Sequence, residues 1–426
     1  MTLCLPPRSR IGELLAPDAF VFATGIEDTF VAQPWPATGR TLDEYELTGH
    51  YARLAEDLDR VADLGVGAAR YGIPWYRVHP APGRFDFSFA DEAIGGLVER
   101  GVAPILDLVH YGAPLWMENA FLHPDFPRHL ADYAAAVAER YRGTVRWYTP
   151  LNEPRIAAWY CGRLGWWPPN RKGWNGFAQV LVALARGIQA AVEALRAVDP
   201  EIVCAHADAT DLYVTDDPAL EAETALRQGL VFLALDLATG RVDATHELFG
   251  WLLARGIEPK HLDALLGAPI DLEIVGINLY PMFTLKRLQR ARGRLRIRSI
   301  YAGADLLERL AELYAARYRC PVFVTETASW GSVEHRRAWL ESSLDAVERS
   351  RARGVPIVGY TWWPLFALVA WAYRQGRRPL ASHLLQMGLY DLEPDGLGRV
   401  RTPLVDLYRE LAAGGSRVAG RLAAGG

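Results

Sequence analysis

Eight short apolar segments recur along the chain, and each is followed by a segment whose apolar residues have helical spacing. The run Ala103-Pro104-Ile105-Leu106 is apolar on both faces, as is typical of a strand buried in a parallel sheet. Over residues 51–64, by contrast, Leu54, Leu58 and Val61 recur every three or four positions, which indicates an amphipathic helix. Parallel strands need connections of a dozen or more residues, which such helices supply. This alternation predicts an α/β fold with a single (β/α)8 barrel.

The expected strands cover residues 20–24, 66–71, 102–109, 145–149, 202–206, 270–277, 322–325 and 356–361. The expected helices cover residues 51–64, 91–100, 132–141, 177–198, 221–238, 304–318, 338–353 and 403–413, while 28–48 has the pattern of a loop. The chain of 426 residues suits one barrel domain, because α/β barrels often run beyond the usual domain length. We expect an N-terminal extension at 1–19 and a flexible tail rich in Gly and Ala at 414–426.

Polar and aromatic residues cluster at or just beyond the ends of the expected strands. The catalytic groups of a (β/α)8 barrel lie at the C-terminal ends of its strands. The residues found there are Arg70, His110, Asn152, Glu153, Asn278, Tyr280, Glu326 and Trp363. So many at one kind of position are hard to attribute to packing alone, so we interpret them as one site.

Two of these residues, Glu153 and Glu326, are glutamates that follow different strands. Glycoside cleavage commonly needs two carboxyl groups, one protonated to release the leaving group and one ionised at the anomeric carbon. We expect Arg70 and Tyr280 to keep Glu326 ionised. Burial among Trp and Pro residues should raise the pKa of Glu153 and make it the proton donor. Either glutamate alone could be a solvated acid, but their shared position with Asn152 favours the paired role.

The remaining site candidates have structural alternatives. His110 could be a hydrogen-bonded core histidine, Arg70 a surface ion pair, and Asn278 with Tyr280 a plain turn. Trp363 and Trp371 could form a platform for a sugar ring or pack in the core. Seven basic residues lie in the segment 286–298, which follows the sixth strand. This segment is either a solvated loop or a surface that attracts an anionic substrate.

Charge and cysteine usage exclude other classes of function. The net charge of −4 favours neither nucleic acid nor an anionic membrane as a partner. The four cysteines show no CxxC spacing, so neither a zinc site nor a disulfide framework is indicated, and we expect no metal or cofactor. The chain has no apolar run of secretory or transmembrane type, which predicts a cytoplasmic protein.

The strand-end segments resemble glycoside hydrolase family 1, the β-glucosidase-like members of a clan of retaining (β/α)8 glycosidases. Thr149-Pro150-Leu151-Asn152-Glu153-Pro154 is similar to the family's acid/base motif, and Val324-Thr325-Glu326 to its nucleophile segment. Further matches are Ala69-Arg70-Tyr71-Gly72-Ile73-Pro74-Trp75, Leu108-Val109-His110-Tyr111, Gly276-Ile277-Asn278-Leu279-Tyr280 and Gly359-Tyr360-Thr361-Trp362-Trp363. The resemblance implies a retaining β-glycosidase with Glu153 as acid/base and Glu326 as nucleophile.

The chain departs from this family pattern where the sugar would be read. The acid that normally holds two sugar hydroxyls is replaced by Ala370, and Thr24-Gly25-Ile26-Glu27 lacks the usual Gln. Because the catalytic pair is kept while the sugar-reading residues are not, we expect an atypical sugar in a small glycoside or an oligosaccharide. The alternatives are a transglycosidase with the same mechanism and a carbohydrate-binding barrel without catalysis.

Overall fold

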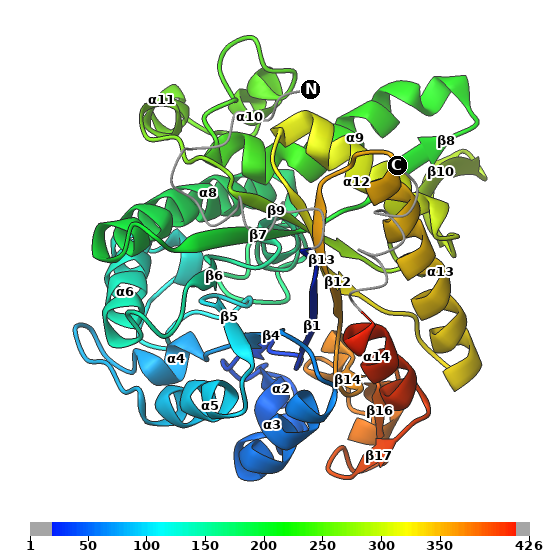
Figure 1. Cartoon of the computed structure of the whole chain (residues 1–426). Coiled ribbons are helices and arrows are strands. Elements are labelled where there is room, and N and C mark those ends of the chain that lie inside the picture. Colours follow the sequence, from blue (N-terminus) through cyan, green and yellow to red (C-terminus); the bar gives the residue numbers. More distant parts are fainter. Residues whose placement is uncertain (1–18, 415–426) are drawn as a thin grey trace.

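Eight parallel strands close into a barrel at the centre of the molecule (Figure 1). The structure is a computed structural model and describes residues 19–414. The strands are β1 (Val21–Gly25), β4 (Ala68–Gly72), β5 (Ala103–Asp107), β6 (Trp147–Thr149), β7 (Val203–Ala209), β9 (Ile274–Leu279), β12 (Val322–Thr327) and β13 (Ile357–Trp362). Strand β1 pairs with both β4 and β13, which closes the sheet. The predicted (β/α)8 barrel is confirmed, whereas the expected extension and tail lie almost wholly outside the described residues.

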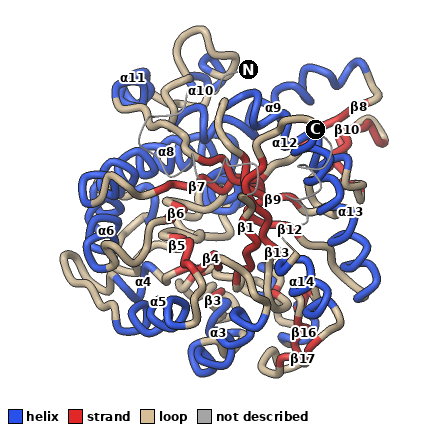
Figure 2. The backbone as a smooth tube through the Cα atoms, in the orientation of Figure 1, coloured by secondary structure: helices blue, strands red, loops and turns tan. Residues whose placement is uncertain are grey.

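Helices surround the barrel, as the blue ring around the red strands in Figure 2 shows. After each strand comes the predicted helix, in order α3 (Leu54–Asp63), α5 (Ser88–Glu99), α6 (Phe126–Arg140), α8 (Gly173–Val198), α9 (Glu221–Ala238), α12 (Asp305–Tyr318), α13 (Val333–Ala352) and α14 (Leu404–Ala413). Several begin earlier than predicted. Helix α13 starts at Val333 because the hydroxyl of Ser332 accepts a hydrogen bond from the His335 backbone N–H and caps its first turn.

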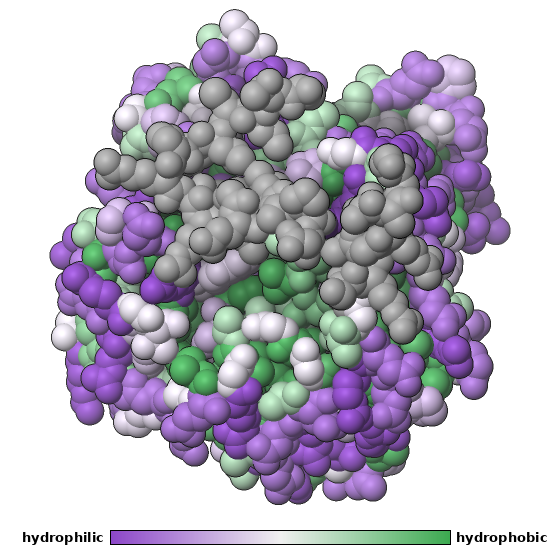
Figure 3. Space-filling view, viewed as in Figure 1, coloured by the Kyte–Doolittle hydropathy of each residue, from purple (hydrophilic) through white to green (hydrophobic). Residues whose placement is uncertain are grey.

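The apolar residues form two layers. A small cluster fills the barrel itself and consists of Ala23, Ala68, Ile105, Val203, Ala205, Ile274, Phe323 and Val358, with Val21 and Trp147 packed against it. A larger cluster lies between the strands and the outer helices. Figure 3 accordingly shows hydrophilic residues around the rim of the visible face and hydrophobic residues toward its centre.

Helix α8 is the one helix of the described residues that is long and apolar enough to cross a membrane. About two thirds of its most apolar window, 67%, is buried inside the molecule. It packs against α6 and α9, so its apolar character is that of a core helix.

Two segments that we predicted as loops contain regular structure. The segment 28–48 forms β2 (Phe30–Val31), β3 (Leu42–Asp43) and α2 (Glu44–Leu47). The basic segment 286–298 lies in an antiparallel hairpin of β10 (Leu285–Ala291) and β11 (Arg294–Ile300), whose first strand pairs with β8 (Leu212–Thr215). The segment is therefore a hairpin and not a loop, and six of the seven residues of β11 are exposed to solvent, as the solvated alternative implied.

Further short elements lie outside the predicted set. They are α4 (Trp75–Val78), α7 (Pro154–Ala158), a π-helical turn (Trp159–Leu164), α10 (Phe249–Ala254), α11 (Pro259–Gly267), β14 (Leu368–Val369), β15 (Leu384–Leu385), β16 (Tyr390–Leu392) and β17 (Arg399–Arg401). Helix α7 and the π-helical turn follow β6 directly, and they carry residues of the site described next.

Candidate active site

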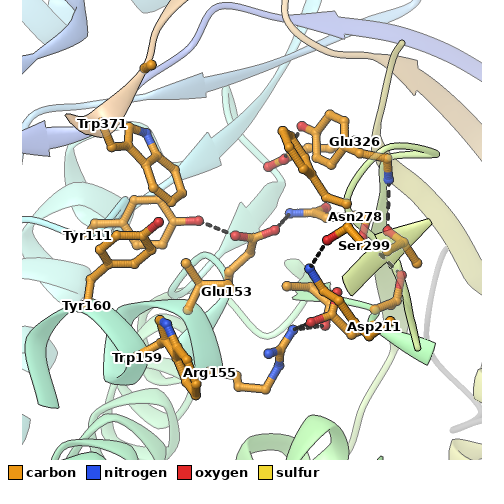
Figure 4. A pocket seen from close by; sticks show the side chains of 18 of the residues that line it. Tyr111, Glu153, Arg155, Trp159, Tyr160, Asp211, Asn278, Ser299, Glu326 and Trp371 are labelled. Atoms are coloured by element: carbon orange, nitrogen blue, oxygen red, sulfur yellow. Dashed lines mark hydrogen bonds and ion pairs between the residues drawn. The ribbon is translucent and has the colours of Figure 1, made fainter. Parts of the chain in front are cut away.

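A cavity of about 660 Å³ opens where the barrel strands end (Figure 4). Side chains from the C-terminal ends of five different strands, or from just beyond them, line it, including Glu27, His110, Glu153, Asn278 and Glu326. Most of the residues that the sequence analysis proposed for the site therefore converge on this one cavity.

Glu153 projects into the cavity from the junction of β6 and α7. Its backbone is left-handed, with φ of 43°, and so is that of Tyr111, with φ of 70°. Such conformations are uncommon for residues other than glycine and concentrate at functional sites. The Tyr111 hydroxyl donates a hydrogen bond to one carboxyl oxygen of Glu153, and Asn278 Nδ2 donates to the other at 2.9 Å.

Glu326 lies on β12, where the pairing with β9 shifts register between Val324 and Glu326. Such irregularities re-aim side chains, and they are frequent beside active sites. Arg70 Nη1 donates to Glu326 Oε1 at 2.7 Å, and the Tyr280 hydroxyl donates to Oε2 at 2.7 Å. Both predicted partners of Glu326 are therefore in place.

The pKa of Glu326 is higher than we expected. Burial and the charge of Glu153 together raise its pKa to about 8, because Arg70 only partly compensates for them. Burial also raises the pKa of Glu153, as predicted, against the hydrogen bonds from Tyr111 and Asn278. Two buried carboxyls that repel each other favour a state with one shared proton. Since Arg70 contacts Glu326 and not Glu153, that proton belongs on Glu153.

Arg70 and Asn152 lie behind the cavity wall and hold the residues that form it. Arg70 is fully buried, and Nη2 donates to Asp107 at 2.5 Å and to Asn152 Oδ1 at 3.0 Å. The Nδ2 of Asn152 contacts His110 Nε2 at 3.0 Å and the Tyr111 hydroxyl at 3.2 Å. The alternative of a surface ion pair for Arg70 is thereby wrong.

Trp363 also lies behind the wall, so of its two alternatives the structure shows core packing and not a sugar platform. Its ring is fully buried, stacks on His110 at a centroid distance of 5.9 Å, and lies 4.7 Å from the Arg70 guanidinium. Gly25 permits this position, because a Cβ atom there would lie 2.0 Å from the Trp363 ring. Trp371, by contrast, lines the cavity, and its ring packs against Tyr111.

His110 lines the cavity and also belongs to a buried network of charged side chains. Its Nδ1 lies 2.5 Å from Asp28 and 3.3 Å from Asp107. Although burial opposes protonation, these two carboxylates raise the pKa of His110 well above its usual value. Glu27, Asp28 and His110 offer ligand atoms close enough for a metal ion. The direct contact between Asp28 and His110 already pairs their charges without one.

Glu27 belongs to the site, although sequence reasoning did not include it among the candidates. It is 6% exposed and lines the cavity. Its Oε1 accepts a hydrogen bond from the Thr29 hydroxyl at 2.6 Å, and Oε2 accepts from Trp363 Nε1 at 3.1 Å. Glu27 follows β1 by two residues, so the strand-end criterion could have found it. Ala370, which stands where the family has an acid, lines the same cavity as Glu27.

Comparisons with known proteins agree with this arrangement. The model of "Glycosyl hydrolase family 1" matches residues 23–232. A bifunctional β-D-glucosidase/β-D-fucosidase of Bifidobacterium breve is 26% identical, over 94% of this chain and 98% of its own length. β-Glucosidase 47 of Arabidopsis thaliana is 23% identical, over 81% of this chain and 72% of its own length. The family 1 β-glucosidase of Thermotoga maritima superimposes with a TM-score of 0.80 at 17% identity, covering 94% of this chain and 98% of that one, which shows a shared fold.

Proposed function

Because this chain is a divergent member of glycosyl hydrolase family 1, and a β-glucosidase-like glycosidase, we propose that it hydrolyses a β-linked glycoside with retention of configuration. The observation that carries the proposal is the unequal pair of buried glutamates in one cavity. Glu153 and Glu326 repel each other's charge, and only Glu326 contacts a cation.

The proposed reaction has two steps. First, Glu326 attacks the anomeric carbon while Glu153 gives its proton to the departing oxygen, which leaves a covalent glycosyl-enzyme. Then Glu153, now ionised, takes a proton from water, and the water oxygen displaces Glu326 from the sugar. Tyr280 and Arg70 hold Glu326 in place, and Asn278 holds Glu153.

The residues that would contact the sugar support a preference for an atypical sugar. Glu27 supplies a carboxylate that is fixed by two hydrogen bonds, whereas Ala370 supplies none. A carboxylate bound to sugar hydroxyls from a different direction would select different hydroxyls. We propose β-D-glucosides and β-D-fucosides as the first substrates to compare, because a relative carries both activities in its name.

Azide rescue of Glu326→Ala tests the proposal. The variant should lose hydrolysis of aryl β-glycosides, and added azide should restore turnover and give an α-glycosyl azide. Azide would then attack from the face that the missing carboxylate leaves open. A β-glycosyl azide, or no rescue for an enzyme whose wild type is active, would contradict the assignment of Glu326.

Transfer of the sugar to another hydroxyl is the second candidate. Trp159, Tyr160 and Trp166 line the cavity, and an apolar wall of this kind favours an organic acceptor over water. Product analysis with and without added alcohol separates the two outcomes. Free sugar alone supports hydrolysis, and alkyl glycoside as the main product at low alcohol concentration supports transfer.

A further inference from the structure

The cavity extends beyond the catalytic pair toward β8 and the β10–β11 hairpin. This extension, which we call the outer compartment, is lined by Arg155, Asp211, Tyr213, Arg227, Lys286 and Ser299. In Figure 4, Ser299 and Asp211 lie on the far side of Glu153 from Trp371 and Tyr111. The outer compartment therefore has its own wall, separate from the sugar-reading residues.

This compartment has more positive than negative charge. The Arg155 side chain is buried, and its Nη2 donates to Asp211 Oδ2 and to the Ala209 carbonyl at 3.0 Å each. Its Nε has no acceptor within the part of the chain that the structure describes. Lys286 Nζ hydrogen-bonds to the Ser299 hydroxyl at 3.1 Å and forms no ion pair with any described residue. Of the carboxylates that line the outer compartment, Asp211 forms an ion pair with Arg155, and none forms one with Lys286.

The other cations near the compartment already have partners. Arg227, which also lines it, pairs with Glu223 at 2.7 Å. Arg287 and Arg290 on the hairpin pair with Asp216 and Asp217 at 3.4 Å each. Among the described residues, Lys286 is therefore the one cation of this wall without an ion-pair partner.

The register of the β10–β11 pairing determines which basic side chain of the hairpin faces the cavity. Lys286 and Ser299 are directly opposite each other in the β10–β11 pairing, and both line the cavity. Arg287 is opposite Arg298, and because successive residues of a strand point to opposite faces, both project away from it. Of the seven basic residues in 286–298, Lys286 alone lines the cavity within the described chain.

The outer compartment also lies on the side from which a leaving group would depart. Arg155 follows the proton donor Glu153 by two residues, on helix α7. Apolar contacts are available beside the charges, since Phe283 and Ile297 line the cavity and are 38% and 39% exposed. An aglycone with an apolar body and an anionic group would match both features.

We infer that the natural substrate carries an anionic group, such as a carboxylate, on its aglycone, and that Lys286 and Arg155 bind this group. The inference rests on the proposed function, because it takes the Glu153 side as the leaving-group side. Lys286 has no ion-pair partner among the described residues, so an anionic oxygen would accept a charge-assisted hydrogen bond from its Nζ, and the nearby Arg155 would add electrostatic attraction.

Two matched substrates test the inference. The 4-(carboxymethyl)phenyl and 4-(carbamoylmethyl)phenyl β-glycosides of one sugar have similar size and leaving-group acidity but differ in charge. The wild-type enzyme should prefer the carboxylate by about tenfold in kcat/KM, mostly through KM, as one charge-assisted contact would give. Lys286→Met should abolish the preference, and Lys286→Glu should reverse it. Arg287→Met is the control, because it removes the same charge from the opposite face of the same strand, and it should keep the preference.

Each result has a defined meaning. Equal kcat/KM for the two substrates in active wild-type enzyme would overturn the inference alone. A Lys286→Met enzyme with an unchanged melting temperature and an unchanged preference would also overturn it. Lys286→Gln serves as the second variant if Lys286→Met is unstable. Failure of wild-type enzyme on all aryl β-glycosides, including nitrophenyl glycosides, would contradict the proposed function instead.

Discussion

The two catalytic glutamates share burial but differ in their hydrogen-bond partners. Glu326 accepts hydrogen bonds from the charged guanidinium of Arg70 and from the Tyr280 hydroxyl. Glu153 accepts hydrogen bonds from two neutral groups, the Asn278 amide and the Tyr111 hydroxyl. The difference gives the two carboxyls different roles while their repulsion keeps one proton in the site. The distribution of charge around each carboxyl therefore decides which one attacks and which one donates.

The pH dependence should follow from this shared proton. The doubly ionised pair forms only at raised pH, because burial raises the pKa of both carboxyls and the charge of Glu153 raises that of Glu326 further. As the pH rises through that range, Glu153 loses the proton that a poor leaving group needs, so kcat/KM for such glycosides should fall. Dinitrophenyl glycosides need no proton, so their kcat/KM should stay level over the same range. A parallel decline for both substrate types would contradict the role of Glu153.

Substitution of Glu153 by Gln separates the same two substrate types. Glu153→Gln removes the proton donor but keeps a side chain of the same shape. We expect kcat/KM for poor leaving groups to fall by about 10²–10⁴, the usual contribution of general acid catalysis. For dinitrophenyl glycosides, kcat/KM should stay within about tenfold. Steady-state kinetics with a series of leaving groups makes the measurement, and an equal loss across the series would argue for a purely structural Glu153.

Glu27 should determine how tightly the sugar binds. Glu27→Gln removes the charge and keeps an oxygen that can accept from Trp363 Nε1. Because hydrogen bonds to charged groups contribute about 1.5–3 kcal/mol, KM should rise about tenfold or more without a change in melting temperature. The control is Glu46→Gln on the exposed face of α2. Unchanged KM values for both variants would remove Glu27 from sugar recognition.

A helix or strand could be predicted when the sequence pattern that indicates it lies within a single segment. The eight strands and their helices were predicted because apolar runs and helical spacing are visible within each segment. The β10–β11 hairpin was missed because its sequence is rich in Arg and its pairing with β8 joins distant segments. Likewise, strand-end position identified Arg70 and Trp363 as site residues but could not tell which side chains reach the cavity and which lie behind it.

Two glycines set the distance between the π-helical turn and α8. A Cβ atom on Gly162 would lie 2.4 Å from the Gly176 carbonyl oxygen, and one on Gly176 would lie 2.4 Å from the Gly162 carbonyl oxygen. Gly162→Ala should therefore destabilise the protein by about 1–3 kcal/mol through overpacking. It should also weaken substrate binding, because the same turn carries Trp159 and Tyr160 into the cavity wall.

Gly95→Ala is the matched control for the contact between the π-helical turn and α8. Gly95 lies in α5 with nothing within 4 Å of an added Cβ, so the substitution should stabilise the protein by about 0.4–1 kcal/mol. Urea denaturation of both variants makes the comparison. Equal stability of Gly162→Ala and wild type would show that the turn can move away from α8 at little cost.

For the whole molecule, the closed barrel connects residues that are distant in sequence. The interior cluster contains residues from seven of the eight barrel strands, and Phe323 is its largest fully buried member. Glu326 follows Phe323 on β12, so the packing that fixes Phe323 also fixes the start of the active-site segment.

Phe323→Ala should lower the free energy of unfolding by about 3–5 kcal/mol, because removing the ring leaves a void in the barrel interior, where residues from seven strands pack together. Urea denaturation measures the loss. At urea concentrations too low to unfold the variant, its activity should also fall, because the altered packing of β12 would displace Glu326. Phe87→Ala, at a partly buried site outside the barrel interior, is the control and should have a smaller effect on both. Full activity in a strongly destabilised Phe323→Ala would separate barrel packing from the position of Glu326.

The covalent intermediate is the central claim, and mass spectrometry of the trapped enzyme tests it most directly. A 2-deoxy-2-fluoro glycoside with a good leaving group, built on the sugar that the enzyme turns over best, should form a long-lived adduct. The proposed mechanism predicts one sugar per chain, attached to the peptide that contains Glu326. Attachment at another residue, or rapid turnover of the natural substrate with no adduct at any inhibitor concentration, would contradict it.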